Sequence, residues 1–158
     1  MFAQPTNYLK NQNQFRTCSM LKVLFVCIHN SARSQMAEAF FNLYATRAED
    51  NAQSAGITPG KLNSYVVRTM SEKGIDISNN PTKAVFDLYK EGKKFSHVIA
   101  VCDESSEHCP IFPGVHKIIT WGFQDPSKFT GSDEEIMQKV RIVRDEIEAK
   151  VKNFLQNV

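Results

Sequence analysis

The chain has 158 residues, of which 42% are hydrophobic and 23% are charged, and its formal net charge is +2. This length and composition predict one soluble globular domain, and so small a net charge argues against nucleic acid or a membrane surface as a partner. No apolar run approaches the length of a membrane span.

Residues 1–19 are rich in Asn and Gln and lack the apolar core of a secretory signal. We therefore expect a polar N-terminal extension followed by a single catalytic domain at 20–158. Without export, the protein is expected to be cytoplasmic, where its four cysteines are reduced thiols. Redox catalysis or metal binding is then a better explanation of the cysteines than a framework of disulfides.

Strand and helix patterns alternate along the chain. Apolar or extended runs predict strands at 23–26, 51–55, 97–101 and 116–121, and helical spacing predicts helices at 35–47, 61–73, 83–89 and 133–158. Thr82 is expected to cap the third helix. This alternation predicts an α/β fold with three layers, in which a parallel sheet of four strands is flanked by helices.

The loop between the first strand and the first helix has the spacing Cys-x5-Arg-Ser. Its backbone N–H groups and the positive end of the helix dipole point at a common centre, where they form a nest for an oxyanion. Asn30 is the loop residue best suited to a left-handed backbone conformation. The residues predicted to bind the oxyanion are Ile28, His29, Asn30, Ser31, Ala32 and Arg33.

Three side chains of this stretch have predicted catalytic roles. The positive field favours the thiolate of Cys27, which makes this residue the candidate nucleophile. Arg33 can close the cradle with its planar, bidentate guanidinium, and Ser34 can donate its hydroxyl to the sulfur. The structural alternative is a small apolar cysteine at a strand end, followed by a serine that caps a helix.

Two further strands end at residues that carry chemistry. Because active groups gather at the carboxyl ends of parallel strands, Cys27, Cys102 and Asp125 are expected to face one crevice. Asp125 is the candidate general acid, and the alternative is a solvated aspartate that opens an Asp-Pro turn.

Cys102 and Cys109 are separated by six polar residues. A thiolate that transfers electrons needs a second sulfur to attack it, and a third allows the disulfide to be passed outward. A zinc site formed with Cys27 and His108 lacks the usual paired ligand spacing, so we expect no metal. Two buried cysteines without a function are the other alternative.

Over residues 21–155 the chain resembles the thioredoxin-coupled arsenate reductases, which share the fold of the low molecular weight tyrosine phosphatases. The motifs that carry this resemblance are CIHNSARSQMAE at 27–38, SAG at 54–56, IDISN at 75–79, Cys102 with Cys109-Pro110, and WGFQDP at 121–126. The resemblance implies arsenate as the substrate, with phosphate as its analogue, and thioredoxin as the reductant. We expect no cofactor and a monomer.

The resemblance also implies a sequence of steps. Cys27 attacks arsenate, and Asp125 assists the departure of hydroxide. Cys102 then attacks Cys27 and releases arsenite, and Cys109 attacks Cys102. Thioredoxin finally reduces the disulfide between Cys102 and Cys109.

Several members of that family bind a potassium ion near positions that match Asn30, Glu38 and Ser54, together with an aspartate where this chain has Lys83. A lysine at this position argues against the ion. Our hypothesis is that the Lys83 ammonium replaces potassium by pairing with Glu38.

The main alternative function is a low molecular weight tyrosine phosphatase that hydrolyses phosphate monoesters through a phosphocysteine at Cys27. Similar phosphatases usually have tyrosines just after Asp-Pro, whereas Ser127-Lys128-Phe129 follows here. This difference and the presence of Cys109 favour the reductase, with weak phosphatase activity expected beside it. A sensor of anions or metals that is not an enzyme explains neither Asp125 nor the cysteine pair well.

Overall fold

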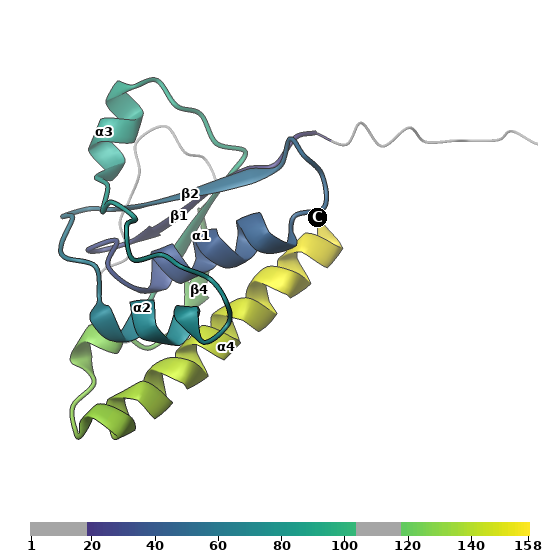
Figure 1. Ribbon diagram of the computed structural model, residues 1–158. Coiled ribbons are helices and arrows are strands. Elements are labelled where there is room, and N and C mark those ends of the chain that lie inside the picture. The colour runs from purple at the N-terminus through teal and green to yellow at the C-terminus, as the bar shows by residue number, and fades with distance from the viewer. Residues whose placement is uncertain (1–18, 104–117) are drawn as a thin grey trace, which may run out of the picture.

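A parallel sheet of four strands, in the order β2-β1-β3-β4, forms the centre of the fold (Figure 1). The computed structural model describes residues 19–103 and 118–158. All four strands correspond to strands predicted from the sequence, and neighbouring strands pair in parallel. Their bounds are Lys22–Cys27 for β1, Asn51–Gly56 for β2, His97–Cys102 for β3 and Ile118–Gly122 for β4.

Helices cover both faces of the sheet. Their bounds are Arg33–Tyr44 for α1, Ser64–Ser71 for α2, Val85–Lys90 for α3 and Asp133–Asn157 for α4. Figure 1 shows α1, α2 and α4 on one face and α3 on the other. The three-layer α/β architecture predicted from the sequence is therefore confirmed.

Alternation along β1 explains why its sequence is an unbroken apolar run. Val23 and Phe25 belong to the larger core, beneath α1 and α4, whereas Leu24 and Val26 pack with Leu88 of α3. Because both faces of the strand are buried, both sets of side chains must be apolar.

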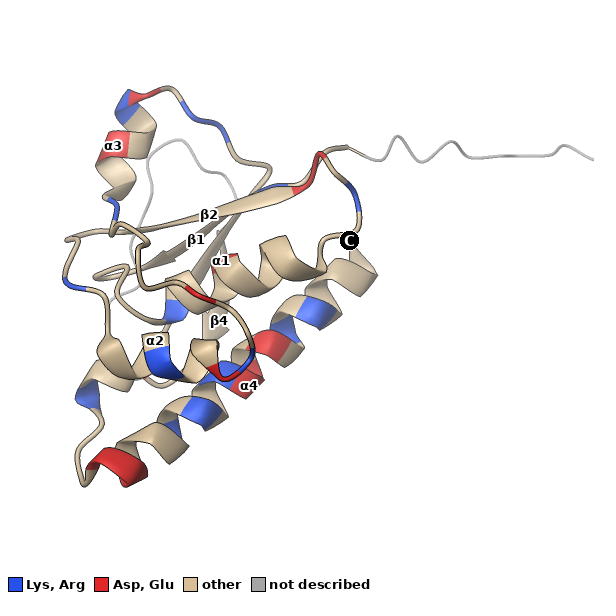
Figure 2. Cartoon of the chain, in the orientation of Figure 1, with Lys and Arg blue, Asp and Glu red and all other residues tan. Residues whose placement is uncertain are grey.

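Lys22 is the only Lys, Arg, Asp or Glu in the four described strands, while charges of both signs interleave along α4 (Figure 2).

Three helix starts differ from the sequence-based prediction: α1 begins two residues earlier than expected, and α2 and α3 begin later. The Asn63 side chain caps α2 by accepting hydrogen bonds from the backbone N–H groups of Tyr65 and Val66, so this helix begins three residues later than expected. The prediction that Thr82 caps α3 was wrong. The Thr82 hydroxyl donates to the Gly60 carbonyl at 2.7 Å instead, and α3 has no side-chain cap.

No helix within 19–103 and 118–158 is long and apolar enough to cross a membrane.

The first turn of α4 explains where this helix of 25 residues begins. Ser132 and Glu135 form a reciprocal capping box at its start, and three acidic residues in the first turn oppose the positive end of the helix dipole.

The buried carboxylate of Glu148 joins α4 to two other parts of the fold. It accepts hydrogen bonds from the Tyr44 hydroxyl at 2.5 Å and from the Lys73 ammonium at 2.7 Å, and Lys152 lies 3.3 Å away. Burial alone would raise the pKa of Glu148, but the hydrogen bonds from Lys73, Tyr44 and Lys152 lower this pKa from 4.5 to about 2.

A pKa that is lower in the folded state than in the unfolded chain means that the ionised form of Glu148 stabilises the fold above about pH 4.5, and that this contribution is lost as the pH falls toward 2. The shift corresponds to about 3 kcal/mol at neutral pH. We expect Glu148→Gln to lower the free energy of unfolding by about 1 to 3 kcal/mol at neutral pH and by much less near pH 3. Urea denaturation at both pH values tests this.

The matched control is Glu146→Gln, because Glu146 is an exposed carboxylate on the same helix. This variant should remain within about 0.5 kcal/mol of the wild type at both pH values. An equal loss of stability in the two variants would contradict a stabilising role of ionised Glu148. So would a loss in Glu148→Gln that does not change with pH.

Candidate active site

The loop between β1 and α1 turns its carbonyl groups outward. Each carbonyl oxygen from Cys27 to Ala32 accepts a hydrogen bond from a group outside the centre of the loop. The donors, in order, are the N–H groups of Ile57, Thr58 and Gly60, the side-chain amide of Gln35, and the N–H groups of Asn63 and Met36. Since the carbonyl oxygens are directed away, the centre of the loop is left without their negative ends, as an oxyanion nest requires.

Asn30 holds the curl of this loop. It has a positive φ of 52°, which confirms the left-handed conformation predicted for it. Its backbone N–H donates to the Cys27 sulfur at 3.2 Å, and its side-chain amide donates to the hydroxyls of Ser34 and Ser54 at 2.8 and 2.9 Å. Asn30 therefore holds both the sulfur and the hydroxyl beside it in place.

The Cys27 sulfur lies 2.9 Å from the Ser34 hydroxyl oxygen. The same oxygen accepts from Asn30, which leaves the hydroxyl proton available to the sulfur. The contact predicted between Ser34 and the sulfur is therefore present. Cys27 is a free thiol and is only 3% exposed, so a substrate must reach it through the centre of the loop.

The buried guanidinium of Arg33 links the loop to the segment after β4. It donates to the Phe123 carbonyl at 3.2 Å and lies 3.4 Å from the Asp125 carboxylate. Asp125 also caps the short 3-10 helix at Pro126–Lys128 by accepting from the Ser127 N–H at 2.9 Å. The structure thus brings Arg33 of the loop next to Asp125 of the segment after β4.

Gln35 is a supporting residue that sequence reasoning did not single out. Its amide donates to both the carbonyl and the side-chain oxygen of Asn30, and to the Pro81 carbonyl, while its own oxygen accepts from Asn80. It is almost fully buried. A polar residue on the buried side of an amphipathic helix is the signal that could have identified it.

Cys102 ends β3, the strand beside β1. Alternation along β3 directs its side chain to the face of Val98, which belongs to the core beneath α3, whereas Cys27 belongs to the opposite core. Cys102 is disulfide-bonded and its partner sulfur lies outside the described residues. The predicted roles of Cys109 and of the zinc alternative with His108 also fall outside them. Within the described part of the chain, no cluster of His, Cys, Asp or Glu could hold a metal ion.

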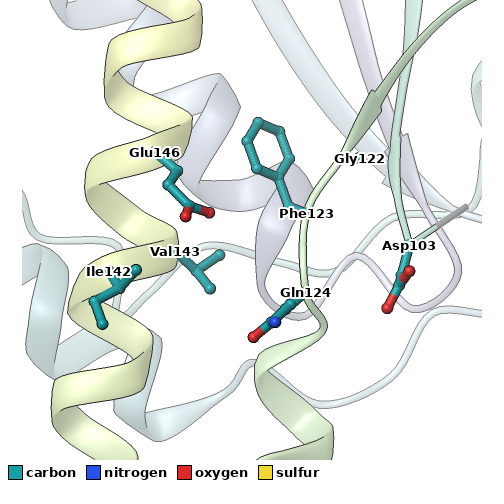
Figure 3. Close-up of a pocket in the computed structure, with 7 residues that line it drawn as sticks. All are labelled: Asp103, Gly122, Phe123, Gln124, Ile142, Val143 and Glu146. Atoms are coloured by element: carbon teal, nitrogen blue, oxygen red, sulfur yellow. The ribbon is translucent and has the colours of Figure 1, made fainter. Parts of the chain in front are cut away.

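A cavity of about 430 Å³ lies beside this site, between the end of β4 and the α4 helix (Figure 3). Its described lining includes the carboxylates of Asp103 and Glu146 but no Lys or Arg. Carboxylates repel an oxyanion, so this cavity is not the oxyanion site. It adjoins the site through Phe123, whose carbonyl accepts from Arg33.

A family model described as "Low molecular weight phosphotyrosine protein phosphatase" matches residues 22–158. The chain belongs to this family. Arsenate reductase from Shouchella clausii is 38% identical to it over 135 residues, which are 85% of this chain and 94% of that protein. The fold expected from the sequence motifs is confirmed by this match.

Solved structures of arsenate reductases are also similar to the chain. The crystal structure of arsenate reductase from Archaeoglobus fulgidus has a TM-score of 0.68 and 34% identity, and the match covers 85% of this chain and 98% of that one. A thioredoxin-dependent arsenate reductase from Corynebacterium glutamicum has a TM-score of 0.54 and 26% identity, covering 86% of this chain and 64% of that one.

Gly56 is the last residue of β2 and of the motif SAG at 54–56. A Cβ atom on Gly56 would lie 2.7 Å from the backbone nitrogen of Asn30 and 2.7 Å from the Ile28 carbonyl oxygen. Both are backbone atoms of the oxyanion loop, which cannot rotate away as a flexible side chain could. Only glycine therefore lets β2 approach the loop this closely.

We expect Gly56→Ala to displace the loop and to lower kcat/KM by about 100-fold, because misplacing reacting groups by about 1 Å can cost that much. The matched control is Gly60→Ala, whose Cβ would lie 3.3 Å from the exposed side chain of His29, which can move. The control should lose less than about threefold. Steady-state kinetics of both variants measures the difference. Equal losses of kcat/KM in the two variants would rule out a close approach of β2 to the oxyanion loop at Gly56.

Proposed function

We propose that this protein reduces arsenate to arsenite, with Cys27 as the nucleophile and with electrons that pass through Cys102 and Cys109 from thioredoxin. The observation that carries the proposal is the Cys27 sulfur, which receives the Asn30 N–H and the Ser34 hydroxyl beneath a loop whose carbonyls face outward. The similarity to proteins named arsenate reductase supports the choice of substrate. Phosphate, with the same shape and charge, is expected to bind as an analogue.

Arsenate binding rearranges the contacts of Arg33 in this mechanism. The guanidinium now lies against the Asp125 carboxylate and the Phe123 carbonyl. The oxyanion, held by the N–H groups of residues 28–33, takes the bidentate guanidinium of Arg33. A carboxylate that loses its guanidinium partner takes up a proton more readily, so Asp125 can then carry the proton that the hydroxide leaving arsenic requires.

The first covalent step forms a bond between the Cys27 sulfur and arsenic and expels one oxygen as water. In the second step the Cys102 thiolate attacks the Cys27 sulfur. The electron pair of the sulfur–arsenic bond then remains on arsenic, which is reduced from As(V) to As(III) and leaves as arsenite. Two thiols are oxidised to one disulfide in exchange, so the electrons balance.

The second step requires the chain at the end of β3 to move. Cys102 is fully buried, pairs with Gly122 in the sheet and accepts from the Phe123 N–H at 3.2 Å, and strand alternation directs its side chain away from Cys27. Disulfide formation needs the two Cα atoms within about 7 Å and the side chains turned toward each other. We propose that the last residues of β3 detach from β4 to allow this approach.

In the third step the Cys109 thiolate attacks the Cys102 sulfur, which returns Cys27 to its thiolate form. Thioredoxin then reduces the disulfide between Cys102 and Cys109. Because the reaction needs reduced thiols, we propose that it takes place in the cytoplasm. We also propose that the chain acts as a monomer with a single catalytic domain at 20–158.

Turnover of arsenate with thioredoxin, thioredoxin reductase and NADPH tests the proposal. Oxidation of NADPH that depends on both arsenate and thioredoxin is the expected result. NADPH oxidation that is the same without thioredoxin would rule out this electron donor, and an inactive wild type would rule out the reductase.

A second activity, the hydrolysis of phosphate monoesters, is favoured by the same geometry and by membership of the phosphatase family. It needs only Cys27 as the nucleophile, Arg33 for the oxyanion and Asp125 as the acid. We propose it as a weak side activity that does not involve Cys102 or Cys109. This makes it a convenient measure of the oxyanion loop alone.

A further inference from the structure

A buried chain of hydrogen bonds leads from the Cys27 loop to a lysine outside it. The side-chain amide of Asn30 donates to the Ser54 hydroxyl at 2.9 Å, and this hydroxyl donates to the Glu38 carboxylate. The other oxygen of that carboxylate lies 3.8 Å from the Lys83 ammonium. Asn30 and Ser54 are fully buried, and the side chains of Glu38 and Lys83 are 19% and 29% exposed.

Lys83 contacts this chain of bonds at both ends. Its backbone N–H donates to the side-chain oxygen of Asn30 at 2.9 Å, and its carbonyl accepts from the Gly56 N–H at 2.8 Å. Its ammonium group meets Glu38 at the far end. Lys83 therefore holds the Asn30 side chain through its backbone and places a positive charge beside Glu38 through its side chain.

The hydrogen bonds of this chain run in one direction, from Asn30 to Glu38. The amide nitrogen of Asn30 can only donate, so the Ser54 oxygen accepts from it and must give its own proton to Glu38. A carboxylate accepts that proton, whereas a neutral carboxyl group would compete as a donor. The Lys83 ammonium supplies the opposite charge that a largely buried carboxylate needs.

The residues at this position do not fit a bound potassium ion. The side-chain oxygen of Asn30 already accepts from the Lys83 N–H and from Gln35, and the Ser54 oxygen accepts from Asn30. The ammonium also lies where it would repel a second cation. The hypothesis that Lys83 pairs with Glu38, based on the sequence, agrees with this geometry.

We propose that Lys83 is a positioning residue that acts as a built-in cation. Through Glu38 and Ser54 it orients Asn30, and Asn30 in turn directs its backbone N–H at the Cys27 sulfur. The oxyanion loop then holds its reactive form without any monovalent ion from solution. This inference concerns the reactivity of Cys27, whichever of the two reactions follows.

The test is the rate at which iodoacetamide alkylates Cys27 in reduced protein, followed by mass spectrometry of the Cys27 peptide. The buffer contains choline chloride, and is then changed to potassium chloride at equal ionic strength. We expect Lys83→Met to lower the rate in choline by about tenfold, as the loss of a supporting contact typically does. Potassium should restore part of this loss by taking the place of the ammonium beside the Glu38 carboxylate. The wild type and Lys83→Arg should stay within about twofold in both salts.

Two controls separate this role from a purely structural one. Lys93→Met removes a lysine whose ion pair with Glu91 lies 3.4 Å apart on the surface, and it should not change the alkylation rate. Glu38→Gln should lose reactivity without rescue by potassium, since the carboxylate that would bind the ion is gone. Melting temperatures show which variants are folded, and Glu38→Gln and Lys83→Arg decide the question if Lys83→Met does not fold.

A wild-type rate for Lys83→Met in choline would overturn the proposal. So would a several-fold acceleration of the wild type by potassium, because the built-in cation would then be insufficient. Failure of thioredoxin-dependent arsenate turnover would leave this result unaffected, since alkylation of Cys27 requires neither Cys102 nor Cys109.

Discussion

Cys27→Ser is expected to abolish both arsenate reduction and the hydrolysis of p-nitrophenyl phosphate, with kcat/KM falling by about 10⁴-fold or more in each assay. A serine hydroxyl has almost the same shape and can accept the Asn30 N–H as the sulfur does. It is not ionised at neutral pH, and it cannot form a disulfide. Both activities therefore depend on properties that only the sulfur has.

Retained binding of oxyanion in Cys27→Ser would show that the loop is intact. Isothermal titration with phosphate should give a dissociation constant within about threefold of the wild-type value, since the N–H groups and Arg33 bind the anion. Cys18→Ser is the matched control, because Cys18 lies in the predicted extension and has no proposed role. A measurable rate of hydrolysis in Cys27→Ser that exceeds about 1% of the wild-type rate would exclude Cys27 as the nucleophile.

Cys102→Ser and Cys109→Ser are expected to separate the two activities. Thioredoxin-dependent turnover of arsenate should fall by about 100-fold or more in both variants, because the disulfide can no longer be passed outward. Hydrolysis of p-nitrophenyl phosphate should remain within about threefold of the wild type, because it uses only the loop and Asp125. Steady-state kinetics of the same preparations in the two assays gives this comparison directly.

The two variants should also differ from each other. Cys109→Ser can still complete one reduction, since Cys102 remains able to attack Cys27, and it should release one equivalent of arsenite before it stops. Cys102→Ser should release none. If Cys109→Ser turns over arsenate at the wild-type rate with thioredoxin, the third sulfur has no part in the relay.

The strand–loop–helix unit around Cys27 could be predicted from sequence because local physical rules determine it. The apolar run of β1, the helical spacing of α1 and the left-handed tendency of Asn30 all act within a few residues. The contact between Cys27 and Ser34 follows from the same short stretch, since the loop curls back on itself.

The supports of the loop could not be predicted in this way, because they come from distant segments. The N–H groups of residues 57–63 reach the loop carbonyls only because β2 pairs with β1 in a particular register. The need for glycine at position 56 likewise arises from the close approach of two strands. For Thr82, local rules gave a wrong prediction. Its hydroxyl donates to the distant Gly60 carbonyl instead of capping a helix.

The pair formed by Lys83 and Glu38 is an intermediate case. The motifs that resemble the arsenate reductases led to the hypothesis that these two side chains meet, although their positions lie 45 apart in the sequence. Sequence alone gave no indication that the Lys83 backbone also binds Asn30. That second contact makes the lysine more than a surface charge.

Disulfide mapping after a single turnover tests the three-sulfur relay most directly. Fully reduced protein is mixed with one equivalent of arsenate in the absence of thioredoxin, quenched with acid, and analysed by peptide mass spectrometry. The wild type should contain a disulfide between Cys102 and Cys109 with Cys27 reduced, and Cys109→Ser should instead contain one between Cys27 and Cys102. Arsenite released without either disulfide, or with Cys102 still a free thiol, would contradict the relay.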